Sequence, residues 1–89
     1  MKRVIRLGDP MSHGGTVVSA SPTTIINGKP VARLGDEVTC PKPGHGTVTI
    51  VEGDPAWLVD GRPVALEGHK TSCGASLIST LPTLGRDPA

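Results

Sequence analysis

The sequence predicts a small all-β protein, and its turn-forming residues, its strand-forming residues and an internal repeat support this prediction. Twelve of the 89 residues are Gly and nine are Pro. Both residue types destabilise helix interiors and suit tight turns, whereas Val, Ile and Thr favour strands. We therefore expect a single domain over residues 1–89. Trp57 is the only aromatic residue, so Val, Ile, Leu and Ala must build most of the core. Trp57 itself is expected to fill the core, with a docking contact as the alternative.

The internal repeat joins two stretches of sixteen residues. SPTTIINGKPVARLGD (21–36) aligns with DPAWLVDGRPVALEGH (54–69) at a constant offset of 33. A single copy is too short to bury an apolar face, whereas copies wrapped around a common axis share one core. The repeat therefore predicts a compact fold built from near-equivalent units.

Short strands separated by turns are expected in each unit. Asn27-Gly28 and Asp60-Gly61 suit two-residue hairpin turns, in which both positions need positive φ. A proline cannot donate to a strand ladder, so Pro30 and Pro63 are expected at strand starts or edges. The expected strands are 15–20, 23–26, 29–33, 46–51, 56–59, 62–66 and 74–80, and residues 80–89 are expected to form a loose tail.

A related turn occurs three times, as GDPMSHGG (8–15), GDEVTC (35–40) and GHKTSCG (68–74). In each turn a metal-binding residue type follows the second position by four residues: His13, Cys40 and Cys73. Three related turns predict pseudo-threefold wrapping, with the turns converging at one end of the molecule.

The converging turns would bring His13, Cys40 and Cys73 together. The second turn continues into CPKPGHG (40–46), where His45 can supply a fourth ligand. Four imidazole and thiolate ligands favour a structural tetrahedral zinc site. The two prolines stiffen this loop, which lowers the entropy cost of placing its ligands.

Other assignments of these residues remain open. His69 stands where the other two turns have Asp9 and Asp36, so it is expected to bond nearby backbone amides as those aspartates do. It can instead serve as a metal ligand in place of Cys40. A Cys40–Cys73 disulfide, or unrelated surface histidines and buried thiols, are the further alternatives.

Charge and hydropathy argue against several classes of function. The formal net charge is +1, without a basic run or aromatic platform, so nucleic-acid binding has little support. No apolar run approaches the roughly 18 residues of a membrane span. No apolar segment of signal-peptide length follows the basic N-terminus MKRVIRLGDP, so the general secretory route is not expected.

With these motifs, the chain resembles the PAAR-repeat family over about residues 7–79. The family motif corresponds to Pro30-Val31-Ala32-Arg33 and, more weakly, to Pro63-Val64-Ala65-Leu66. The resemblance implies a small conical, β-helix-like or β-prism fold with pseudo-threefold repeats that converge on a zinc-bound apex. Residues 7–79 would form the repeat core of a single PAAR domain.

Family members commonly hold zinc with three histidines and one cysteine. Carried over to this chain, the resemblance places the ligands at His13, Cys40, His45 and Cys73, which gives two of each type. His69 in place of Cys40 would restore the usual composition, but the repeat alignment favours Cys40.

The resemblance also implies a function that is mechanical and not enzymatic. Such proteins cap the trimeric VgrG spike of the type VI secretion system and sharpen it for membrane puncture. We expect a free monomer that docks as one chain per VgrG trimer. It would be made in the cytoplasm and exported by that system without a signal peptide. No room for a fused toxin domain is evident, so an effector would be carried by noncovalent contact.

Two other functions are alternatives to the secretion spike. The same fold can tip a phage or another contractile-tail spike. A small zinc hydrolase would need a general base, for which Asp9, Asp36 and Glu67 are candidates. Four protein ligands would close the metal site to water, which argues against hydrolysis.

Overall fold

The computed structural model describes residues 3–41, 44 and 46–80, and in this part of the chain every regular element is a strand. The strands are β1 (Ile25–Ile26), β2 (Lys29–Pro30), β3 (Glu37–Cys40), β4 (Gly46–Thr49), β5 (Asp54–Val59) and β6 (Arg62–Val64). They pair as three antiparallel hairpins, β1–β2, β3–β4 and β5–β6. No helix able to cross a membrane occurs among the described residues. The predicted all-β fold is confirmed.

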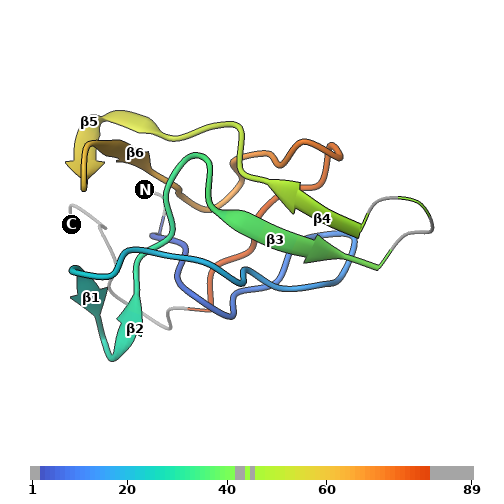
Figure 1. Ribbon diagram of the computed structural model, residues 1–89, viewed down its shortest axis with the longest axis horizontal. Helices are drawn as coiled ribbons and strands as arrows, with labels where there is room; N and C mark the ends of the chain where they lie inside the picture. The colour runs from blue at the N-terminus through green and yellow to red at the C-terminus, as the bar shows by residue number, and fades with distance from the viewer. Residues whose placement is uncertain (1–2, 42–43, 45, 81–89) are drawn as a thin grey trace.

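The hairpins point to opposite ends of an elongated molecule (Figure 1). The turns of β1–β2 and β5–β6 lie at one end, which we call the base. The β3–β4 hairpin extends to the other end, which we call the apex (Figure 1). Two hairpins therefore lie at the base, and the turns that carry the metal-binding residue types lie towards the apex (Figure 1).

Three equivalent segments surround the molecular axis and are joined in a closed cycle. Ile5 N donates to Ala65 O (3.0 Å), Ala65 N to Ala32 O (3.0 Å), and Ala32 N to Ile5 O (2.8 Å). A second cycle, with bonds of 2.8 Å each, joins Leu7 to Pro30, Leu34 to Pro63, and Glu67 to Arg3. Because each segment donates to one neighbour and accepts from the other, the predicted pseudo-threefold wrapping is confirmed.

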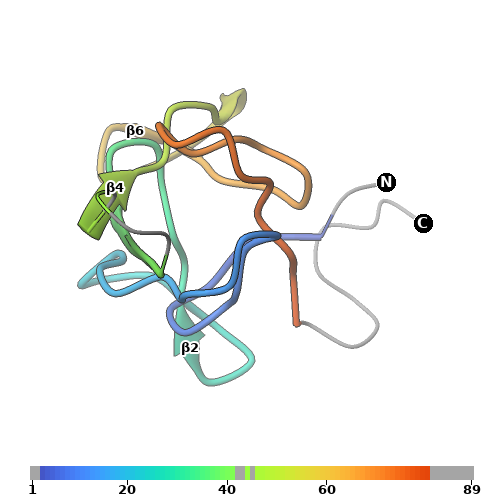
Figure 2. The same cartoon turned by 90° about the vertical axis from the view of Figure 1, so that its right-hand side faces the viewer.

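The N-terminal segment RVIRLGD (3–9) is a further copy of the repeat and the first along the chain, and it matches PVARLGD (30–36) in the second repeat and PVALEGH (63–69) in the third. A further cycle of equivalent bonds lies closer to the apex and joins Thr39 to Thr16, Ser72 to Thr49, and Ser12 to Ser76. Seen from the apex, the chain winds around the axis (Figure 2).

The core follows the axis as two clusters of buried aliphatic side chains. The cluster at the centre and apex contains Ile5, Met11, Val17, Ala32, Val38, Cys40, Val48, Ile50, Ala65, Ala75 and Leu77. The second cluster contains Val4, Val31, Val59 and Val64. Trp57 is half-buried and packs against this second cluster together with Ile26 and Leu66, which is the core role expected of it.

Several strand predictions need correction. Residues 15–20 and 74–80 were expected to be strands, but they pair only at single positions, such as Val17 with Val38 and Leu77 with Met11. Residues 37–40 were treated as a turn and instead form β3. Because the chain winds around the axis, residues 15–20 and 74–80 each pair with neighbouring segments only at isolated positions before the chain turns. Residues 37–40 pair with β4 along their whole length.

The two hairpin turns at the base were predicted correctly. Asn27 and Asp60 have φ of 49° and 55°, and the glycine that follows each also has positive φ. Pro30 and Pro63 lie in two-stranded sheets, in which every strand is an edge. Of the expected tail 80–89, only Thr80 lies within the described residues, and its hydroxyl donates to Asp9.

Candidate metal centre

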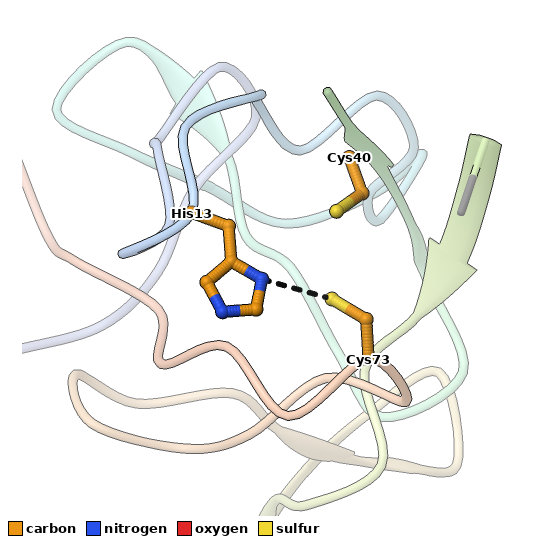
Figure 3. A group of neighbouring side chains, drawn as sticks. All are labelled: His13, Cys40 and Cys73. Carbon is orange, nitrogen blue, oxygen red and sulfur yellow. Dashed lines mark hydrogen bonds between the residues drawn. The ribbon is translucent and has the colours of Figure 1, made fainter. Parts of the chain in front are cut away.

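His13, Cys40 and Cys73 meet at the apex. Their ligand atoms all lie within 4.8 Å of one another. The three side chains enter the same space from different segments (Figure 3). Cys73 Sγ lies 3.7 Å from His13 Nδ1. The repeat alignment therefore located a real cluster, formed by positions 27 and 33 residues apart along the chain.

A side chain closes the turn that precedes each of these residues. In each repeat this side chain, from Asp9, Asp36 or His69, accepts a hydrogen bond from the backbone N–H three residues earlier. The bonds run from Arg6 N to Asp9 Oδ2 (2.8 Å), from Arg33 N to Asp36 Oδ2 (2.7 Å) and from Leu66 N to His69 Nδ1 (2.9 Å). Because the three turns have the same closure, the residue four positions later reaches the apex in each repeat.

His69 therefore has the turn role that was expected of it. Its Nδ1 replaces a carboxylate oxygen as the backbone acceptor. Among the described residues, the group of clustered ligand atoms consists of His13, Cys40 and Cys73 and does not include His69. This arrangement favours Cys40 over His69 as the apical ligand of the second repeat.

The acidic residues nominated as a general base lie elsewhere. Asp9 and Asp36 are 0% and 2% exposed, and their carboxylates accept backbone N–H groups within their own turns. Glu67 Oε1 lies 3.5 Å from Arg3 Nε. Because each of these carboxylates is engaged in contacts of its own, none of these three acids is poised as a base beside the cluster.

The cysteines differ in their surroundings. Cys40 is buried, with 6% of its surface exposed, whereas Cys73 is half-buried. Burial raises the pKa of the Cys73 thiol, but hydrogen bonds from the Thr71 hydroxyl, the Ala75 backbone, Cys40 and His13 outweigh it and lower the pKa to about 6. The Thr71 hydroxyl lies 3.2 Å from Cys73 Sγ. The lowered pKa favours the thiolate of Cys73, the form that binds metals.

The distances suit a tetrahedral metal ion. Zinc bonds of about 2.3 Å to sulfur and about 2.1 Å to nitrogen place neighbouring ligand atoms roughly 3.6–3.8 Å apart. The 3.7 Å between Cys73 Sγ and His13 Nδ1 already has this value. The 4.8 Å limit on the whole group leaves about 1 Å of adjustment. His45, the fourth ligand expected from the sequence, lies outside the described residues.

Two residues that support the cluster were missed by the sequence reasoning. Thr71 is one, because its contact with Cys73 depends on the turn conformation. Gly15 is the other: it has a φ of +79°, and a Cβ there would lie 2.0 Å from the Thr39 carbonyl oxygen. Only glycine permits this approach of the first repeat to β3. The Gly-Gly pair at 14–15 was the one available signal.

Comparison with known protein families identifies a motif in this chain. The family model of the PAAR motif matches residues 7–79. A search of curated proteins found no match.

Proposed function

This chain belongs to the PAAR motif family, and we propose that it is the structural tip of a type VI secretion spike. In this proposal the apex holds a zinc ion and the base docks on the VgrG trimer. The protein acts mechanically: it keeps its shape while the spike crosses a membrane and delivers effectors bound without covalent linkage.

The observation that carries the proposal is the cluster of His13, Cys40 and Cys73 at one end of the molecule. One ion held by these residues would crosslink three repeats that are otherwise joined at the apex by backbone hydrogen bonds. The binding energy of a structural metal adds to folding stability, and a crosslink at the apex opposes local opening. We propose His45 as the fourth ligand, which would close the coordination sphere.

The base supplies the support for docking. Its two hairpins present large exposed apolar residues at equivalent positions: Ile25 is 62% exposed and Leu58 is 57% exposed. The Arg6 guanidinium donates to Ile26 O in the first hairpin turn (3.2 Å), and Arg33 donates to the Asp60 carboxylate in the second (2.9 Å). The hairpins are therefore held in place before any partner arrives, which lowers the entropy cost of binding.

The symmetry of the fold fits one chain per trimer. Each repeat occupies one third of the closed hydrogen-bond cycles around the axis. Three repeats arranged around one axis can match a true threefold spike, with each repeat facing one VgrG chain. The net charge of +1 indicates that apolar and backbone-edge contacts, more than charge pairing, would provide the affinity.

The metal part of the proposal is tested by elemental analysis of the purified chain. We expect about one zinc per chain, because a structural tetrahedral site binds a single ion. Cys40→Ala should lower both zinc content and melting temperature. Val51→Ala, at an exposed position away from the cluster, is the control and should change neither. A wild-type chain that contains no zinc when purified and takes up none when zinc is added would contradict this part of the proposal.

The docking part is tested by co-purification with VgrG trimers. We expect one chain per trimer, and we expect Ile25→Glu combined with Leu58→Glu to abolish binding because both charges would be desolvated at the interface. Val51→Glu is the matched control and should bind normally. Unchanged binding of the double variant would reject the base hairpins as the contact. Failure of the wild-type chain to bind VgrG would reject the role in type VI secretion and favour a phage or other contractile-tail spike.

A further inference from the structure

The apex contains two thiols whose sulfur atoms face the same space. Cys40 lies at the end of β3 and Cys73 in the third repeat's turn, and the Sγ atoms lie within 4.8 Å of each other. Both side chains point toward the His13 ring (Figure 3). A disulfide needs a sulfur–sulfur distance of about 2.05 Å. The sulfurs must therefore approach by less than about 3 Å, a movement that side-chain rotation and small adjustments of the turn can share.

The two thiols differ in access. Cys73 is half-buried in a turn that also contains Ser72 and Gly74, whereas Cys40 is 6% exposed and belongs to the core cluster. A small oxidant from solution reaches Cys73 first. Cys40 is shielded from such a molecule but is close to the Cys73 sulfur. This is the arrangement of an attacking thiol with a resolving thiol beside it.

We propose that Cys40 and Cys73 form an intramolecular disulfide when the apex carries no metal and the chain meets an oxidising environment. The oxidant belongs to the class of small disulfides, of which oxidised glutathione is one. Cys73 sulfur attacks one sulfur of the oxidant, and the first small thiol leaves. Cys40 sulfur then attacks Cys73 sulfur and releases the second small thiol. The two cysteine protons pass to the two released thiols, so two protein thiols are oxidised and one small disulfide is reduced.

The consequence is an apex with two alternative crosslinks. In the reducing cytoplasm the thiols stay free for a metal, and in an oxidising compartment such as the periplasm a disulfide is stable. Either crosslink joins the β3 end to the third repeat across a sequence separation of 33 residues. The alternation between a metal crosslink and a disulfide rests on the proposed function, because it requires a bound metal. The disulfide itself requires only the two sulfur atoms.

The test uses the full-length chain, freed of metal with a chelator and shown to be folded by circular dichroism. After incubation with oxidised glutathione, free thiols are alkylated and the intact mass is measured. We expect wild-type protein to lose two hydrogens, to retain no glutathione and to remain monomeric. Cys40→Ser should retain glutathione on Cys73, because the resolving thiol is absent. Cys73→Ser should react slowly, because Cys40 is buried.

Two further experiments complete the test. One asks whether the fold, and not chance collision, brings the two thiols together, and the other asks whether bound zinc prevents the disulfide. In concentrated urea, release of glutathione from the mixed disulfide should be at least about tenfold slower than in the folded chain, because unfolding lowers the effective concentration of Cys40. Zinc-loaded wild-type protein should resist oxidation. If the chain binds no zinc yet still forms the disulfide, the metal part of the proposed function fails and the disulfide stands. Persistent glutathione on wild-type Cys73, disulfide-linked dimers, two free thiols, or equal rates in urea would each overturn the disulfide proposal.

Discussion

Substitutions of His69 can distinguish its hydrogen bond within the turn from a role as a metal ligand. In the structure His69 Nδ1 accepts the Leu66 N–H at 2.9 Å, as a carboxylate oxygen does in the other two turns. We expect His69→Ala to destabilise the fold while leaving zinc bound. We expect His69→Asp to recover much of the loss, since it installs the residue found at the equivalent position of both other repeats.

The size of the effect follows from the lost acceptor. A part-buried N–H left without its partner costs about 1–2 kcal/mol. Unfolding entropy of roughly 2.1 cal/mol/K per residue makes about 0.19 kcal/mol/K for a chain of 89 residues. His69→Ala should therefore lower the melting temperature by roughly 5–10 °C. The restored carboxylate should bring His69→Asp back to within a few degrees of the wild type.

The assay combines thermal melts followed by circular dichroism with zinc analysis of the same samples. Cys40→Ala is the contrasting variant, since it should lose zinc. If His69→Ala loses its zinc while Cys40→Ala retains it, the ligand set includes His69 and the reasoning from the cluster is refuted. If His69→Asp is as unstable as His69→Ala, acceptance of the backbone N–H is not what His69 contributes.

Two further predictions concern the apex. In metal-free Cys40→Ser, thiolate ultraviolet absorbance should titrate Cys73 with a midpoint below that of an ordinary thiol, and adding Thr71→Val should raise this midpoint, because the Thr71 hydroxyl is the strongest group lowering the pKa of Cys73. Since the pKa of Cys73 in the folded chain lies below the ordinary thiol value of 9.0, its thiolate stabilises the metal-free fold fully above pH 9, and this stabilisation is lost as pH falls towards 6. A midpoint unmoved by Thr71→Val would contradict the cause assigned. Gly15→Ala should lower the melting temperature far more than Gly74→Ala, because both have positive φ but only Gly15 closely approaches another backbone; equal losses would show that this approach is unimportant.

Much of the architecture was predictable because it repeats in the sequence. The matched turns located His13, Cys40 and Cys73, and the same alignment identified His69 as a turn residue. The N-terminal copy of the repeat also has a signal in the sequence, since VIRLGD (4–9) differs from VARLGD (31–36) at one position, but only its GD turn was identified from the sequence.

The missed features depend on which segments and side chains lie beside one another in space. Residues 37–40 form a strand because β4 lies beside them, while 15–20 and 74–80 have similar composition and make single-residue bridges. Strand propensity describes a residue's fit to a pleated surface, and it does not say how long a neighbouring segment stays in register. The contact of Thr71 with Cys73 is local, but it depends on the conformation of the turn, so it left no signal in the sequence.

The sequence by itself determined the class of the fold, the threefold repetition and which residue types recur at equivalent positions. These properties are local or periodic, so they can be read along the chain. The tertiary structure decided that the equivalent positions meet at a single point, with His13, Cys40 and Cys73 within 4.8 Å of one another. Side chains from three repeats approach this closely only because hydrogen bonds between neighbouring repeats close into cycles around one axis, and each bond joins residues far apart in the sequence.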